Sequence, residues 1–182
     1  MSKESVYFRE GRLIAKSNDV RIYDLEGELF LEDGRLNLIA SDQKLSDYVW
    51  QIADKPFGHC LIAGLGLGLT AKYIRSLTKT KSITIVEENK DIIAVNHTLN
   101  RLPKAFKVIN YDYITYLYES TNKYDFIFLD CYSKIDTTTI PYIADVVAAG
   151  KKALKPNGIL IGWLDNHTPE RLVEPFYDLF NF

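Results

Sequence analysis

The chain has 182 residues, of which 47% are hydrophobic and 25% charged, and its formal net charge is −2. These values are typical of one globular domain with a sizeable core, and they exclude the strongly basic balance that favours nucleic acid as a partner. No apolar run reaches the roughly 18 residues of a membrane span, and the N-terminal residues lack the apolar core of a signal peptide. We therefore expect a cytoplasmic protein that does not bind a membrane and gives no clear signal for nucleic acid, although a local basic patch stays possible.

The first part of the chain reads as a small β unit. Residues 20–40 alternate short β-rich runs with Glu-Gly and Asp-Gly turns, which predicts an antiparallel meander. The residues that follow have a helical period that ends at Pro56. We expect residues 1–55 to form this unit and residues 56–182 to form an α/β unit, the two packed as one compact body.

After Pro56 the pattern alternates between strand and helix up to the last residues. Near-continuous apolar runs of this kind indicate a parallel sheet that is buried on both faces by helices. The runs lie at 59–64, 82–88, 106–112, 124–130 and 158–164, the last one preceded by a predicted Lys-Pro-Asn-Gly turn. We predict an α/β fold with a doubly wound, mostly parallel, Rossmann-like sheet. We expect it to be abbreviated at the C-terminus, because the final residues read as a helix rather than as further strands.

Three glycines, Gly64, Gly66 and Gly68, occupy alternate positions in "AGLGLG", where the first of these strands meets a helix. In open parallel sheets the ligand crevice lies beyond the carboxyl ends of the strands, beside such a loop. Glycine lets a ligand approach the main chain, and the N–H groups that open the helix can bind a polar group. Packing of strand against helix is the alternative, but three glycines exceed what packing needs.

The spacing differs from the dinucleotide fingerprint GxGxxG, whose third glycine would fall on Leu69. Three acidic residues instead lie at the carboxyl ends of consecutive predicted strands: Glu87, Asp112 and Asp130. Glu87 comes about 20 residues after the glycine loop, where an acceptor for ribose hydroxyls is expected. Each acid alone could equally be a helix N-cap or a solvated loop residue, but their shared rim favours a ligand site.

The motifs "LIAGLGLG", "ITIVEENKDII", "VINYDYITYL", "YDFIFLD" and "LKPNGILIGW" occur in this order. Together they resemble the class I S-adenosylmethionine-dependent methyltransferases and, within that fold, the spermidine synthase-like branch. The resemblance implies S-adenosylmethionine, decarboxylated S-adenosylmethionine or methylthioadenosine as ligand, with no metal. The cofactor contacts it implies are Gly64, Leu65, Gly66, Gly68, Glu87, Glu88, Asp112, Tyr113 and Asp130.

The resemblance also implies individual roles. Glu87 would hold the ribose hydroxyls, and Asp112 would accept from the adenine amino group, with Tyr113 beside the ring. Asp130 would lie at the sulfonium end, where it could orient the cofactor or act as the catalytic base for the acceptor. Asn37 would face the substrate, and Tyr132 could pack against the cationic centre.

One departure bears on the reaction. The aminopropyltransferases of that branch carry Asp-x-x-Asp after the fourth strand, whereas this chain has Ser133 in place of the second acid. Methyl transfer to a small acceptor is therefore favoured over aminopropyl transfer. A catalytically silent nucleotide-binding or assembly module on the same fold stays open as an alternative.

The two cysteines fit a reducing compartment and lie in no metal-ligand pattern. Cys60 begins the first predicted strand and Cys131 follows the fourth, so parallel strands would place them at opposite ends of the sheet. We expect no disulfide between them, and we expect Cys131 to be an inert thiol, because no histidine lies near it in sequence.

The last helix presents apolar residues on one face, including Phe176 and Phe180. This face can cover the edge of the sheet at the fifth strand or can dock on a second subunit. Because cyclic dimers are the commonest closed assembly, we expect a homodimer with the C-terminal segment at or near its interface.

Overall fold

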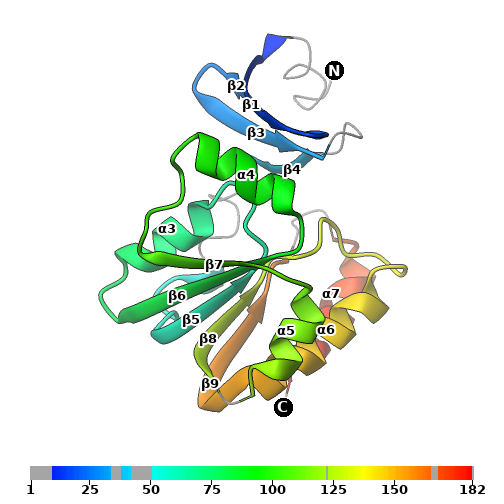
Figure 1. Ribbon diagram of the computed structural model, residues 1–182. Helices are drawn as coiled ribbons and strands as arrows, with labels where there is room; N and C mark the ends of the chain where they lie inside the picture. The colour runs from blue at the N-terminus through cyan, green and yellow to red at the C-terminus, as the bar shows by residue number, and fades with distance from the viewer. Residues whose placement is uncertain (1–9, 34–37, 42–50, 122, 165–167, 182) are drawn as a thin grey trace.

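The computed structural model describes residues 10–33, 38–41, 51–121, 123–164 and 168–181 and contains two sheets (Figure 1). The smaller sheet is antiparallel, with its four strands in sequence order. Its strands are β1 (Arg12–Ser17), β2 (Val20–Leu25), β3 (Glu28–Glu32) and β4 (Leu38–Ser41). The predicted meander is confirmed, with β1 as an additional strand before residue 20.

The larger sheet has five strands in the order β7-β6-β5-β8-β9, and every neighbouring pair is parallel. The strands are β5 (Gly58–Ala63), β6 (Thr80–Glu87), β7 (Phe106–Asn110), β8 (Tyr124–Leu129) and β9 (Leu154–Gly162). The strand order reverses at β5, so the topological switch point lies at its carboxyl end, where open α/β sheets form their ligand crevice.

The helices cover both faces of this sheet. They are α3 (Leu69–Ser76), α4 (Lys90–Thr98), α5 (Tyr113–Glu119), α6 (Ile140–Ala153) and α7 (Glu170–Phe180). Figure 1 shows α3 and α4 on one side of the sheet, and α5, α6 and α7 together on the other. The predicted doubly wound α/β fold is confirmed. None of these helices among the described residues is long and apolar enough to span a membrane.

The antiparallel sheet is anchored on α4. Ser17 Oγ and Asn18 Nδ2 both donate to Asp91 Oδ1 in the first turn of that helix, at 2.7 and 2.8 Å. At its other end, β4 brings Ala40 against the glycine loop, within contact distance of a Cβ placed on Gly66. The meander therefore lies against the glycine loop. The predicted boundary between the two units at residue 55 stays a prediction.

Two details differ from the sequence prediction. The predicted helix after the meander falls mostly on residues 42–50, outside the described residues. The fifth strand of the parallel sheet begins at Leu154 rather than after the Lys-Pro-Asn-Gly turn. Leu154 already pairs with Tyr124, and the turn forms an irregularity within the strand, with Asn157 at φ 63°. Pairing through both flanks of the turn thus extends the strand.

The closing helix α7 covers its own sheet. Phe176 is only 1% exposed, and a Cβ on Gly162 of β9 would overlap the ring of Phe180. The helix was predicted to cover the edge of the sheet or to dock on a second subunit; the structure instead packs its apolar face on the face of β9 and against α6. Docking on a second subunit stays a prediction. Cys60 and Cys131 are both free, as expected from their opposite ends of the sheet.

Candidate functional site

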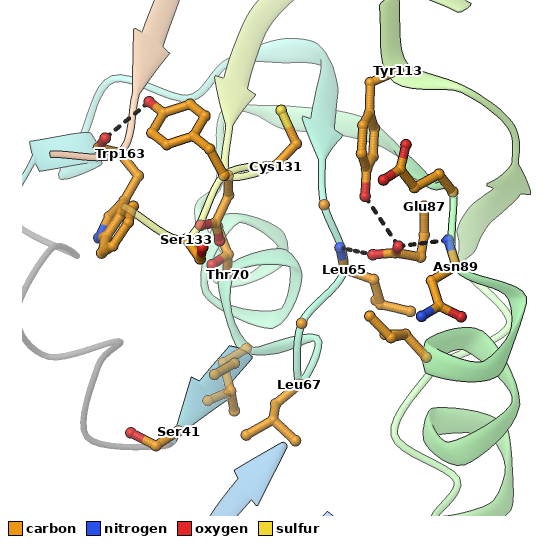
Figure 2. A pocket seen from close by; sticks show the side chains of 18 residues that line it. Ser41, Leu65, Leu67, Thr70, Glu87, Asn89, Tyr113, Cys131, Ser133 and Trp163 are labelled. Carbon is orange, nitrogen blue, oxygen red and sulfur yellow. Dashed lines mark hydrogen bonds between the residues drawn. The ribbon is translucent and has the colours of Figure 1, made fainter. Parts of the chain in front are cut away.

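A pocket of about 290 Å³ lies at the carboxyl ends of β5, β6 and β8, the place expected for a ligand in this topology (Figure 2). Its lining comes from the glycine loop, from the ends of β4 and β6, from the start of α5 and from the segment after β8. The lining residues are Ala40, Ser41, Gly64, Leu65, Gly66, Leu67, Leu69, Thr70, Glu87, Glu88, Asn89, Ile92, Tyr113, Asp130, Cys131, Tyr132, Ser133 and Trp163.

Gly64 lies at the end of β5, directly beside the main chain of Asp130 after β8. Its φ is 103°, and a Cβ there would overlap the carbonyl oxygen of Asp130. Its N–H continues the ladder to Val86 O at 2.9 Å, and Asp130 N donates to Ala63 O at 2.8 Å. A side chain at Gly64 would therefore separate β5 from β8 just where the pocket opens, which explains the glycine without invoking a ligand.

The rest of the loop is held from outside the pocket by groups on and just after α4. Asn96 Nδ2 donates to the carbonyl oxygen of Gly66 at 2.8 Å, and Arg101 Nε donates to that of Leu67 at 3.0 Å. These bonds fix the carbonyls away from the pocket. Gly68, at φ 72°, is the N-cap of α3.

Glu87 is the central polar group of the site, and its side chain is buried, with 2% exposed. Its Oε2 accepts from Leu65 N at 2.9 Å, whereas its Oε1 accepts from Asn89 N at 2.9 Å and from the Tyr113 hydroxyl at 3.0 Å. Burial raises the pKa of this carboxyl, and the three hydrogen bonds oppose the rise. The carboxylate thus fastens the glycine loop to the end of β6 (Figure 2).

Asp112 and Tyr113 both follow β7, but their side chains point in different directions. Asp112 is exposed and caps α5, because its Oδ1 accepts from Thr115 N at 2.8 Å, which lowers the pKa of the carboxyl. Tyr113 is buried and turns into the pocket. The structure therefore brings Tyr113, but not Asp112, into the lining, and the predicted adenine contact of Asp112 stays a prediction.

The segment after β8 forms the opposite wall. Tyr132 is buried, and its hydroxyl donates to Trp163 O at 2.9 Å, so the ring rather than the hydroxyl is presented to the pocket. Burial raises the pKa of the Cys131 thiol, which keeps it protonated at neutral pH, as expected for an inert cysteine. Asp130 and Ser133 complete this wall.

Most of the predicted residues meet in one place. The pocket contains Gly64, Leu65, Gly66, Glu87, Glu88, Tyr113, Asp130 and Tyr132, whereas Gly68 and Asp112 lie outside its lining. Asn37 falls outside the described residues. The sequence prediction included the N–H groups at the start of the following helix, where Thr70 lies, but it missed the contributions of Ser41 and Trp163. Trp163 lies within the fifth apolar run and directly follows β9, so a strand-end signal could have found it, whereas Ser41 comes from the other sheet.

The charge of the lining is one-sided. Among the described residues that line the pocket, the charged ones are Glu87, Glu88 and Asp130. Partial burial and the nearby carboxylate of Asp112 raise the pKa of Glu88. Three carboxyl groups around one pocket favour a ligand that carries positive charge. Within the described ranges, no three histidine, cysteine or acidic side chains gather in a way that could hold a metal ion.

Neither a family model nor a curated protein sequence matches this chain. Solved structures do match. Spermidine synthase from Thermotoga maritima has a TM-score of 0.68, at 14% identity over 92% of this chain and 61% of that one. Spermidine synthase in complex with the transition-state analogue AdoDATO has a TM-score of 0.67, at 14% identity over 92% of this chain and 60% of that one. A putative sarcosine dimethylglycine methyltransferase from Galdieria sulphuraria is a weaker match, with a TM-score of 0.47 at 20% identity over 66% and 45% of the two chains.

The chain thus has a class I methyltransferase-like fold of the spermidine synthase-like kind, as the sequence motifs predicted. It spans about three fifths of the length of the spermidine synthase structures that it matches.

Proposed function

We propose that this protein binds an adenosyl sulfonium compound, S-adenosylmethionine or its decarboxylated form, and transfers an alkyl group from it to a small acceptor. The observation that carries the proposal is the buried carboxylate of Glu87 at the switch point, bonded to the glycine loop beside it. A carboxylate at the end of the second parallel strand suits the vicinal hydroxyls of a ribose. The fold of the matching structures supports the same placement.

The residues of the pocket fit such a ligand. The acidic lining suits a sulfonium and an ammonium group, since opposite charges attract strongly where water is partly excluded. The ring of Tyr132 would pack against the cationic centre, because its hydroxyl is already bonded to Trp163 O. The absence of a glycine at Leu69 disfavours a dinucleotide.

The sulfonium supplies the reactive carbon and, after attack by the acceptor nucleophile, leaves as a neutral thioether. The protein then needs mainly to align the acceptor and to receive its proton. Asp130 is the group proposed for this, because it lines the pocket after β8 and its carboxylate can accept an N–H or O–H proton.

Methyl transfer is the form that Ser133 supports, because the hydroxyl replaces the second carboxylate that would take a proton from an attacking amine. Aminopropyl transfer is the second candidate, favoured by the likeness to spermidine synthase and by the acidic lining, which disfavours the carboxylate of S-adenosylmethionine. The ligand and acceptor are small molecules in both cases.

The test is turnover with S-adenosylmethionine and, separately, with its decarboxylated form, each with a panel of small amines and phenols. Chromatography distinguishes S-adenosylhomocysteine, the product of methyl transfer from S-adenosylmethionine, from methylthioadenosine, the product of aminopropyl transfer from the decarboxylated form. We expect S-adenosylhomocysteine, and we expect its formation to fall at least a hundredfold in Asp130→Asn, since positioned acid–base groups contribute about 10²–10⁴-fold. Binding of either sulfonium compound without formation of either product would favour a catalytically silent nucleotide-binding or assembly module.

A further inference from the structure

Tyr113 occupies an unusual position for the first residue of a helix. It follows β7, yet its side chain crosses the carboxyl end of β6 so that its hydroxyl reaches Glu87 Oε1 at 3.0 Å. The ring is buried and forms part of the pocket wall. Figure 2 shows it pointing to Glu87, with Cys131 on its other side.

The hydrogen bonds of Glu87 can be counted against what a ribose requires. A carboxylate offers about four acceptor positions, two on each oxygen. Oε1 already accepts from Asn89 N and from the Tyr113 hydroxyl, and Oε2 accepts from Leu65 N. One position is left, whereas the 2′ and 3′ hydroxyls of a ribose bring two donors.

The three donors differ in how easily they can leave. The N–H groups of Leu65 and Asn89 belong to the main chain, and Asn89 is also the N-cap of α4, so both are fixed. The Tyr113 hydroxyl is carried by a side chain. The start of α5 is held separately by the bond from Thr115 N to Asp112 Oδ1, so the helix start does not depend on the bond from the Tyr113 hydroxyl to Glu87.

We propose that the Tyr113 hydroxyl competes with the ligand for Glu87, so that binding of an intact ribose requires this hydroxyl to give up its acceptor. The inference rests on the proposed function. It adds the part of the ligand that Glu87 recognises and a residue that limits the affinity for that ligand. The ligand is a ribonucleoside derivative with both hydroxyls free, and Tyr113 holds its affinity below what Glu87 could provide.

The test compares the wild type with Tyr113→Phe, which keeps the ring and removes only the hydroxyl. Tyr118→Phe serves as the matched control, because Tyr118 lies on the same helix and is exposed. Each protein is titrated by calorimetry with adenosine and with 2′,3′-dideoxyadenosine, after thermal melting has shown that the variants are folded. Titrations with methylthioadenosine and with S-adenosylmethionine test the proposed function in the same proteins.

We expect Tyr113→Phe to bind adenosine about tenfold more tightly than the wild type, the effect of one intramolecular hydrogen bond that no longer has to be broken. The affinity for 2′,3′-dideoxyadenosine should stay the same, because that ligand has no 2′ or 3′ hydroxyl to donate to Glu87. Tyr118→Phe should match the wild type with both ligands.

Three outcomes would overturn the inference. Unchanged or weaker binding of adenosine by Tyr113→Phe would show that the hydroxyl does not compete, while the proposed function would stand on the wild-type binding. An equal gain in affinity for both ligands would show that the Tyr113 hydroxyl occupies space that the ligand needs, rather than an acceptor position of Glu87. No binding of adenosine, methylthioadenosine or S-adenosylmethionine to either protein would overturn the proposed function together with the inference.

Discussion

Glu87 and Leu65 are joined by a buried hydrogen bond of 2.9 Å from the main-chain N–H of Leu65 to the Oε2 of Glu87. This bond links the end of β6 to the glycine loop after β5, the two segments that would hold the ribose. The proposed ligand-binding carboxylate is therefore also a structural member of the site.

Replacing Glu87 should affect binding and stability together. We expect Glu87→Ala to weaken the binding of an adenosyl ligand by one to two decades, because charge-assisted hydrogen bonds contribute about 1.5–3 kcal/mol. The loss of an acceptor for buried donors should also lower the free energy of unfolding by about 1–3 kcal/mol. Calorimetry and chemical denaturation measure the two effects.

The matched control is Glu119→Ala, an exposed glutamate of α5 outside the pocket lining. It should leave both quantities close to their wild-type values. Binding by Glu87→Ala that equals the wild type would show that this carboxylate is not the ribose acceptor.

Ligand affinity should depend on pH through Glu87. Burial raises the pKa of this carboxyl above its ordinary value of 4.5, and ribose hydroxyls donate to the ionised form. Affinity should therefore be full above the raised pKa and fall as the pH decreases through it. Affinities measured by calorimetry across this range would show the fall.

Glu88 is a second carboxyl of the pocket lining whose pKa is raised, by partial burial and by the carboxylate of Asp112. The pKa of Tyr113 is raised from an ordinary value that is already above neutrality, so this phenol stays protonated in the acidic range. Glu88→Gln should retain the pH dependence. A fall that vanishes in Glu88→Gln would assign it to Glu88 instead.

Two substitutions of Asp112 can separate its role as a helix cap from its predicted role in ligand binding. Asp112→Ala removes the bond to Thr115 N and should lower the free energy of unfolding by about 0.5–2 kcal/mol. Serine is an equally good N-cap but is too short to reach beyond the helix start, so Asp112→Ser should restore the stability.

Ligand titrations of these two Asp112 variants decide its role. If Asp112 contacts adenine as the sequence motif predicts, Asp112→Ser should bind more weakly than the wild type despite its restored stability. Wild-type affinity in Asp112→Ser would show that the residue is only a cap.

The predicted homodimer can be tested at α7. Among the described strands, β9 has a neighbour only on its β8 side, and α7 packs on the face of β9 through Phe180. Deletion from Thr168 onward should expose this strand and produce a dissociated or aggregating protein, measured by analytical sedimentation. A strictly monomeric wild type at high concentration, with an unaffected deletion variant, would contradict the prediction.

The sequence was informative wherever a signal is local to one strand and its turn. The apolar runs predicted the five strands of the parallel sheet, and the acidic residues at their carboxyl ends, such as Glu87 and Asp130, lie at one rim as predicted. Gly64 was predicted to approach a ligand, whereas its φ and its approach to Asp130 explain it as a packing requirement, so its contact with a ligand stays a prediction.

Other features depend on how distant segments pack. Nothing near Asn96 or Arg101 in sequence indicates that they hold the carbonyls of the glycine loop, because these contacts exist only once α4 lies against it. The competition of Tyr113 for Glu87 likewise depends on the order of β7 and β6 in the sheet. From the sequence alone, Asp112 could either cap a helix or contact the ligand, and the structure shows that it caps α5.

We expect the pocket to select an adenosyl sulfonium or thioether rather than a dinucleotide. The most direct test is the thermal unfolding temperature of the wild type with S-adenosylmethionine, with methylthioadenosine and with NAD, each at the same excess. A ligand that binds the folded state stabilises it in proportion to its affinity. We expect a rise with S-adenosylmethionine or methylthioadenosine and none with NAD, whereas stabilisation by NAD alone would contradict this selectivity.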